Sequence, residues 1–173
     1  MNRDVHFRHL IIFFLLLNLI GCTQESQYPE YFKVKYKTLQ GKNTSLSDFG
    51  GKIIALHFWS SDCQECKASN QIILDLLKDF KNRTVILGVN TDKLENQQKL
   101  PDIALKFGMN YDSLYDPDLS LVQILEVERQ PALVILQYSN DKIRKDVMYD
   151  LDISDSSALQ TKINEIIKSG DHK

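Results

Sequence analysis

The stretch KIIALHFWSSDCQECKASN, residues 52–70, changes its hydrophobic pattern at one point, and that change decides the fold. Residues 52–59 form a nearly continuous apolar run, which is typical of a strand covered on both faces. From Cys63 onward the apolar residues recur at spacings of three and four, which predicts a helix. The stretch therefore predicts a buried central strand that leads into a helix, with Cys63 and Cys66 where the two meet.

Further strands and helices alternate along the rest of the chain. An alternating pattern predicts an edge strand over 31–37, followed by a turn at 41–43 and a short helical turn over 46–49 capped by Ser45. Pro101 predicts a kink or a break in the helix that residues 92–107 indicate. Other strands are expected at 84–90, 132–138 and 142–149, and other helices at 119–125 and 155–168. This order predicts an α/β fold, a central mixed sheet with helices on both faces.

Composition sets the class of protein. Hydrophobic residues make up 43% and charged residues 25% of the 173 residues, as in an ordinary globular domain. The net charge is -2, and the lysines are scattered among acids, so the sequence predicts no binding to nucleic acid.

The N-terminal residues resemble an export signal. Arg3 and Arg8 precede an apolar run over 11–20, which is too short to span a bilayer comfortably. The ending Leu-Ile-Gly-Cys at residues 19–22 resembles a bacterial lipobox, in which the cysteine is lipidated. An ordinary signal peptide or an uncleaved anchor is the alternative. We expect a lipoprotein signal peptide over 1–21, a tether over 22–30 and one domain over 31–170, held on a membrane by Cys22.

The cysteines at 63 and 66 have a plausible redox chemistry. A cysteine at a helix N-terminus is favoured as a thiolate by the free amides and the helix dipole. Cys63 is then the attacking sulfur, and Cys66, one turn into the helix, is suited to resolve a mixed disulfide. Two inert thiols or half of a zinc site are the alternatives. A structural zinc site normally has four ligands, and we expect no metal because the histidines are poorly placed to complete one: His6, His9, His57 and His172.

The stretch SLSDFGGKIIALHFWSSDCQECK, residues 45–67, resembles the active-site region of the thioredoxin-like thiol:disulfide oxidoreductases of the TlpA and ResA type. Their pattern is L-x-D-x-x-G-K, a buried strand that ends in F-W, and then C-x-x-C. The similarity continues through VILGVNTD, KFGMNYDSLYDPD and QPALVIL, and covers about residues 35–168. It implies a thioredoxin-like fold and a redox-active Cys63–Cys66 disulfide with no other cofactor.

The same resemblance assigns further site residues. It implies a cis Gln130–Pro131 peptide bond opposite the C-x-x-C, with the backbone of Gln130 offered to a substrate; a trans proline at a strand start is the alternative. His57 stands where many thioredoxins place a buried acid that accepts a proton from the resolving thiol, although a packed, hydrogen-bonded histidine also explains it. Trp59 is expected to pack under the active-site loop, with contact to substrate as a secondary role.

Two residues depart from the family pattern. Asp62 stands where tryptophan is common, and Glu65 stands where proline is common. Both could be solvated surface charges without consequence. Negative charge beside Cys63 nevertheless disfavours its thiolate, which predicts a reducing rather than an oxidising couple.

The sequence therefore predicts a monomeric oxidoreductase anchored by lipid in a bacterial cell envelope, facing the periplasm or extracytoplasmic space. Its partners would be protein disulfide clients and an upstream thiol reductant, with cytochrome maturation as a process typical of the family. A copper chaperone-like module is one alternative, but those modules resemble C-x-x-x-C with a distant histidine. A peroxiredoxin-like peroxidase is another, but the P-x-x-x-T-x-x-C pattern is missing because residues 52–62 contain no proline or threonine.

Overall fold

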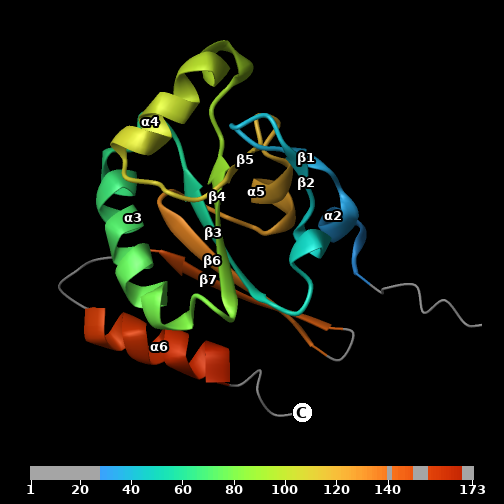
Figure 1. Ribbon diagram of the computed structural model, residues 1–173, viewed down its shortest axis with the longest axis vertical. Helices are drawn as coiled ribbons and strands as arrows, with labels where there is room; N and C mark the ends of the chain where they lie inside the picture. Colours follow the sequence, from blue (N-terminus) through green and yellow to red (C-terminus); the bar gives the residue numbers. More distant parts are fainter. Residues whose placement is uncertain (1–27, 140–141, 150–155, 169–173) are drawn as a thin grey trace, which may run out of the picture.

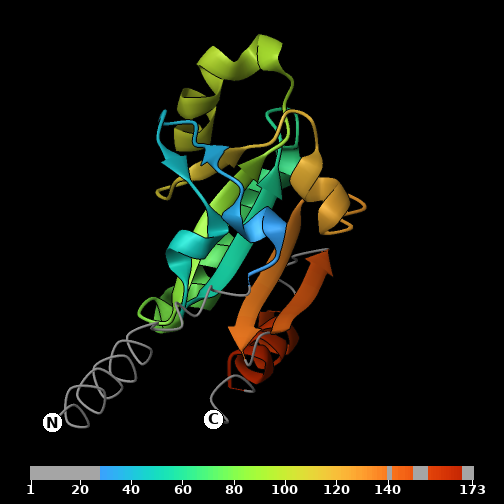
Figure 2. The same cartoon turned by 90° about the vertical axis from the view of Figure 1, so that its right-hand side faces the viewer.

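The computed structural model describes residues 28–139, 142–149 and 156–168, and a five-stranded mixed sheet lies at its centre (Figure 1). The order across the sheet is β5 (Ser113–Tyr115), β4 (Thr84–Asn90), β3 (Ile53–Trp59), β6 (Ala132–Ser139) and β7 (Lys142–Tyr149). The strands β3, β4 and β5 are parallel, and β6 and β7 add an antiparallel edge that lies beside the C-terminal helix α6 (Ser156–Lys168) (Figure 2). All seven residues of β3 are buried, which confirms the predicted central strand.

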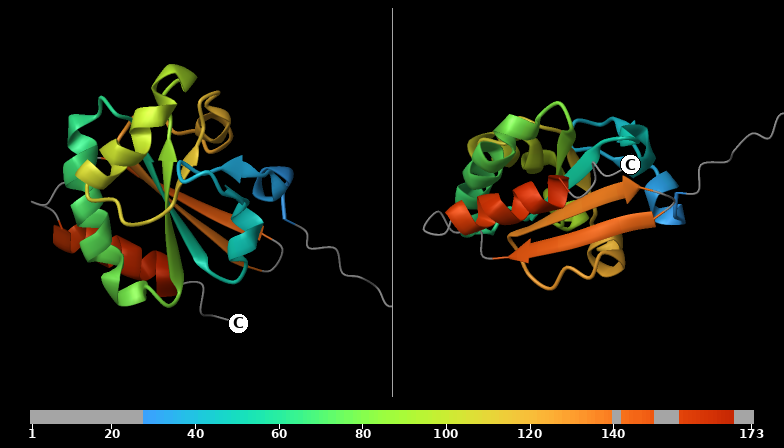
Figure 3. Two further views of the ribbon diagram at one scale, coloured as in Figure 1. Left: turned by 45° about the horizontal axis from the view of Figure 1, so that its top comes forward. Right: turned by 90° about the horizontal axis from the view of Figure 1, so that it is seen from below.

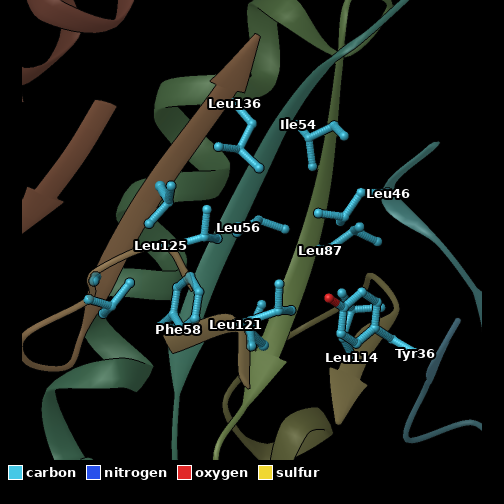
Figure 4. Packing of buried hydrophobic residues seen from close by; sticks show 14 of the residues in the cluster. Tyr36, Leu46, Ile54, Leu56, Phe58, Leu87, Leu114, Leu121, Leu125 and Leu136 are labelled. Atoms are coloured by element: carbon cyan, nitrogen blue, oxygen red, sulfur yellow. The ribbon is translucent and has the colours of Figure 1, made fainter. Parts of the chain in front are cut away.

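Helices cover both faces of this sheet (Figure 3). On one face, α3 (Gln64–Leu77) and α6 (Ser156–Lys168) pack against alternate residues of β3 and β6. On the other face, α2 (Glu30–Lys33), the 3₁₀ turn η1 (Leu46–Phe49) and α5 (Ser120–Ile124) enclose a cluster of leucine, isoleucine and aromatic side chains (Figure 4). The predicted α/β fold with helices on both faces is confirmed.

The N-terminal part of the domain differs from the prediction. Residues 31–37 do not form one strand: they begin in α2, and only Tyr36–Lys37 is a strand, β1, which pairs with β2 (Asn43–Thr44). Pro29 precedes α2 with a φ of -58°, and its carbonyl accepts from the Phe32 N–H at 2.9 Å. The helical turn buries Phe32, which leaves only 2% of that side chain exposed. Core packing of this aromatic ring therefore overrides the alternating pattern.

Two other local predictions are refined. The capped turn at 46–49 is confirmed, because the Ser45 N–H donates to the Asp48 carboxylate at 2.8 Å. The helix expected over 92–107 is divided into a 3₁₀ segment, η3 (Leu94–Lys99), and α4 (Leu100–Lys106), with Pro101 in the first turn of α4. Strand β5 was not predicted from the sequence.

The predicted signal peptide over 1–21, Cys22 and residues 23–27 of the predicted tether lie outside the described residues. Tyr28, near the end of that tether, stacks on Phe32 with ring centroids 5.5 Å apart and also contacts Tyr138. Within residues 28–139, 142–149 and 156–168, no helix is long and apolar enough to cross a membrane.

Candidate active site around Cys63 and Cys66

Cys63 and Cys66 form a disulfide at the junction of β3 and α3, with Cα atoms 5.3 Å apart. Cys63 is the N-cap residue of α3, and Cys66 lies in the first turn. The side chain of Cys66 is fully buried, whereas Cys63 is partly exposed. Of the two cysteines, Cys63 is therefore the one that another protein can approach.

The loop before Cys63 is held in place by a carboxylate at the end of β4. Asp92 accepts from the Ser61 N–H at 2.8 Å and from the Ser61 hydroxyl at 2.5 Å. The Asn90 amide donates to the same carboxylate at 2.7 Å. Asp92 was not predicted as a site residue, although it ends the VILGVNTD segment that carries part of the family resemblance.

Gln130 and Pro131 lie at the same end of the sheet as the C-x-x-C loop. The peptide bond between them is cis, and the ladder pairs Phe58 with Ala132, the next residue after Pro131. The Gln130 side chain donates to the Thr91 hydroxyl at 2.7 Å, and the Thr91 N–H donates to the Trp59 carbonyl at 3.1 Å. Thr91 therefore links the residue before the cis-proline to the end of β3.

A groove of about 560 Å³ begins at the C-x-x-C loop. Ser60 and Asp62 line its side next to the loop, and the Ser60 hydroxyl donates to Asp62 at 2.6 Å. Gln130 is also part of the wall. The apolar lining residues lie just before, within and just after α5, namely Leu119, Val122 and Val127, and the remaining lining residues are polar or charged, namely Thr91, Asp92, Lys93, Glu95, Glu128 and Arg129. The groove therefore lies beside the loop that carries Cys63.

Trp59 packs beneath this region and is fully buried. Its indole N–H donates to the Ser113 hydroxyl at 2.9 Å, and its ring contacts the edge of Phe107 at 5.8 Å between centroids. Gly88 lies against the same pair, because a Cβ there would be 2.5 Å from Ser113 Oγ and 3.0 Å from Trp59 Nε1. The ring is therefore a support for the site, and its burial leaves it no surface to offer a substrate.

His57 lies on β3, on the face covered by α3, and is fully buried. Its Nε2 is 3.1 Å from Ser69 Oγ, and its Nδ1 is 3.0 Å from Tyr111 Oη. The Ser69 hydroxyl also lies 3.0 Å from the Cys66 carbonyl. Burial lowers the pKa of His57 to about 3, so the ring is neutral at physiological pH.

The polar partners of His57 on α3 were not predicted from the sequence. In this part of α3 the apolar Ala68 is exposed, whereas the polar Ser69 and Asn70 are buried. Ser69 and Asn70 lie three and four residues after Cys66, so they share its buried helix face. Polar residues at these two positions were the signal in the sequence that could have indicated a buried hydrogen-bond partner.

Asp62 and Glu65 are both exposed beside Cys63. Asp62 faces the groove, and Glu65 lies in the first turn of α3. Among the described residues, no group of three or more histidine, cysteine, aspartate or glutamate side chains is placed to hold a metal ion. Cys22, His6, His9 and His172 lie outside that part of the chain.

The sequence matches a known family and several named proteins. Residues 25–146 match the AhpC/TSA family. The chain is 29% identical over 98 residues to the thioredoxin-like protein YneN of Bacillus subtilis, covering 49% of this chain and 58% of that protein. It is 28% identical over 97 residues to the thiol-disulfide oxidoreductase ResA of the same organism, covering 56% of this chain and 53% of that protein. The chain thus spans little more than half the length of these two relatives.

Solved structures share the fold at lower sequence identity. A secreted disulfide oxidoreductase of Mycobacterium tuberculosis, homologous to E. coli DsbE, superposes with a TM-score of 0.62 at 20% identity over 79% of this chain and 98% of that chain. A cysteine-to-serine mutant of peroxiredoxin Q from Xanthomonas campestris gives a TM-score of 0.63 at 15% identity over 80% of this chain and 95% of that chain. These likenesses support the thioredoxin-like fold alone. The chain therefore belongs to the AhpC/TSA family, and it has the thioredoxin-like fold with a disulfide between the two cysteines of its C-x-x-C motif.

Proposed function

We propose that this chain is a thiol:disulfide oxidoreductase that reduces disulfides in specific client proteins through Cys63 and Cys66. The observation that carries this proposal is the unequal exposure of a linked cysteine pair at the start of α3. Cys63 faces the surface beside a groove, and Cys66 is enclosed one turn behind it. The named relatives YneN and ResA support the same class of activity.

The reaction begins with the reduced protein. The Cys63 thiolate attacks one sulfur of a client disulfide and forms a mixed disulfide, and the other client sulfur leaves as a thiolate. Cys66 then attacks Cys63, which releases the second client sulfur as a thiolate and leaves the Cys63–Cys66 disulfide. Two electrons pass from the protein dithiol to the client disulfide. An upstream thiol reductant restores the dithiol.

Several residues would assist these steps. The backbone of Gln130 would hydrogen-bond the client beside Cys63, next to the cis peptide bond. His57 would accept the proton of Cys66, because its ring is linked through Ser69 to the turn that carries Cys66. Asp62 and Glu65 oppose the thiolate of Cys63, so the couple is a reductant with a potential nearer thioredoxin's, about -270 mV, than the roughly -120 mV of a strong oxidant.

Trapping of clients tests the assignment of the two cysteines. Cys66→Ala should accumulate a mixed disulfide with clients, because the trapped species cannot be resolved, whereas Cys63→Ala should accumulate none. Non-reducing electrophoresis after rapid alkylation measures both. Capture by Cys63→Ala with none by Cys66→Ala would reverse the assignment, and capture by neither would remove the proposed activity.

The proposal includes the place of work. Lipidation of Cys22, on the lipobox-like sequence at residues 19–22, would hold the protein as a monomer on the outer side of a bacterial membrane, where disulfides form. Membrane fractionation of Cys22→Ser tests this anchor. The variant should be released into the soluble fraction, and equal membrane association of both proteins would exclude Cys22 as the anchor.

A peroxidase is the second candidate function, because the chain belongs to the AhpC/TSA family and shares the fold of peroxiredoxin Q. The missing P-x-x-x-T-x-x-C pattern disfavours it. Peroxide consumption by the reduced protein distinguishes the two functions: we expect slow, stoichiometric oxidation, and rapid turnover of peroxide would favour the peroxidase. Metal analysis addresses the copper chaperone-like alternative, which tight binding of copper by the two cysteines would support.

A further inference from the structure

A continuous chain of hydrogen bonds, buried around Ser69 and part-buried around Tyr111, runs from the first turn of α3 to the end of α4. It begins at the Cys66 carbonyl, passes through Ser69 and both nitrogens of His57 to Tyr111, and continues to Asn70. Asn70 donates through its Nδ2 to the Phe107 carbonyl at 3.0 Å, at the end of α4. His57, Ser69 and Asn70 are each at most 1% exposed. Bulk water therefore does not satisfy these groups.

A backbone carbonyl determines which atom donates in each of these hydrogen bonds. The Phe107 carbonyl can only accept, so the neighbouring atom of Asn70 is the donor Nδ2, and Oδ1 faces Tyr111. This Oδ1 also only accepts, so the Tyr111 hydroxyl, 2.5 Å away, gives it its single hydrogen. Burial raises the pKa of Tyr111, which keeps the phenol protonated. Tyr111 therefore accepts from His57, and the Nδ1 of His57 carries a hydrogen.

When all of these groups are neutral, they carry one hydrogen too few for their hydrogen-bond contacts. Four contacts link Cys66 O, Ser69, His57, Tyr111 and Asn70, and each contact needs one hydrogen. Ser69, neutral His57 and Tyr111 supply only three. The deficit falls at Ser69, whose single hydrogen is shared between His57 Nε2 at 3.1 Å and Cys66 O at 3.0 Å. A proton added at Nε2 would donate to Ser69, which would then donate to Cys66 O, and all four contacts would be complete.

We propose that Tyr111 is a positioning residue: it holds the hydrogen of His57 on Nδ1, and so keeps Nε2, on the Cys66 side, free to take the proton that Cys66 loses. The inference rests on the proposed function and adds the device that orients its base. In the resolving step, the Cys66 sulfur bonds to the Cys63 sulfur, the bond from Cys63 to the client breaks, and the client leaves as a thiolate. The proton of the Cys66 thiol is assigned to His57 Nε2, the nitrogen that faces Ser69 and the turn of α3 that carries Cys66.

Removing the phenol oxygen should reverse the tautomer. In Tyr111→Phe the Nδ1–H would have no acceptor, whereas a hydrogen on Nε2 would still reach Ser69, which can donate to the Cys66 carbonyl. Nε2 would then be blocked as a base. Asn70→Ala should act in the same direction, because the Tyr111 hydroxyl, without its acceptor, can donate to Nδ1. Tyr36→Phe is the matched control, since the Tyr36 hydroxyl donates to the Tyr31 carbonyl at 3.2 Å in the core on the other face of the sheet.

Nitrogen-15 NMR of the His57 ring in the full chain tests the tautomer directly. We expect Nδ1 protonated and Nε2 bare in the wild type and in Tyr36→Phe, and the reverse in Tyr111→Phe. Asn70→Ala gives a second test of the same reversal should Tyr111→Phe fail to fold. Hydrogen on Nε2 in the wild type, or on Nδ1 in both site variants, would overturn the inference. The NMR measurement needs no catalytic turnover, so its result does not depend on whether the proposed function holds.

A single-turnover experiment with the small disulfide 5,5′-dithiobis(2-nitrobenzoate) tests the consequence. The first thionitrobenzoate is released when Cys63 is modified, and the second when Cys66 attacks the mixed disulfide. We expect Tyr111→Phe to leave the first release unchanged and to slow the second by at least about tenfold, as loss of a general base does. Tyr36→Phe should alter neither. An unchanged second release in a variant with the reversed tautomer would overturn the role of Nε2, and absence of the first release would count instead against the proposed function.

Discussion

His57 should make the protein sensitive to mild acid. The ring is neutral and enclosed in the folded protein, where burial lowers its pKa to about 3, whereas in the unfolded chain it titrates near its ordinary value of 6.5. Between these two values the unfolded state binds one more proton than the folded state. The free energy of unfolding therefore falls as the pH falls from the ordinary pKa toward the lowered one.

The size of the effect follows from this difference. Below the unfolded pKa the stability falls by about 1.4 kcal/mol per pH unit, so His57 alone should remove about 2.7 kcal/mol between about pH 7.5 and 4.5. The exposed Asp48 also has a lowered pKa, of about 2, against an ordinary 3.8. Its contribution is present above the ordinary value and is lost only as the pH falls toward the lowered one, so it stays almost constant above about pH 4.5.

Urea unfolding of the oxidised wild type and of His57→Gln, measured at several pH values over this range, isolates the histidine. The variant should be less stable at neutral pH, because glutamine does not reproduce the contacts with Ser69 and Tyr111. The wild type should nevertheless lose about 2.7 kcal/mol more than the variant on acidification, so the two curves converge. Parallel curves would show that His57 titrates alike in both states, which would refute a neutral, enclosed ring.

Three further substitutions probe the supports of the site. Gly88→Ala should cost about 1–3 kcal/mol in urea unfolding, because the added Cβ would lie 2.5 Å from a buried side-chain oxygen. Asp92→Ala should accelerate hydrogen exchange at the Ser61 amide and cost roughly 1.5–3 kcal/mol, since the hydrogen bonds it removes are to a charged group. Asp62→Asn combined with Glu65→Gln should raise the reduction potential, measured against glutathione, by about 30 mV, with a smaller change at high salt. An unchanged potential would show that these two acids do not act on Cys63.

The fold could be predicted because its strongest signals are long and regular. The apolar run that became β3 is buried along its whole length, and the helical pattern after Cys63 became α3. The failures fall on short elements that tertiary contacts define. Strand β5 has only three residues, and α2 is a single turn whose one buried residue is Phe32. Neither is long enough for its own periodicity to be read from the sequence.

The candidate site was predictable only where chemistry is local in sequence. The two cysteines lie three residues apart at a recognisable junction, and the family resemblance pointed to Pro131. Tyr111 is 54 residues from His57 and meets it because Gly88 of β4 pairs with both His57 and Ser113, which lies two residues after Tyr111. A hydrogen-bond partner at that separation leaves no trace in one sequence.

Under the proposed function, the two tasks of a disulfide reductant would be separated in space. On the client side, Asp92 and Thr91 hold the loop and the residue before the cis-proline beside the groove that a client would enter. On the buried side, the hydrogen bonds through His57 would take up the proton of Cys66 away from the surface that a client would cover. A bound client would block solvent from the disulfide at the moment when Cys66 must ionise. A proton acceptor inside the domain, reached through α3 rather than through the groove, lets the resolving step proceed while the client is still attached.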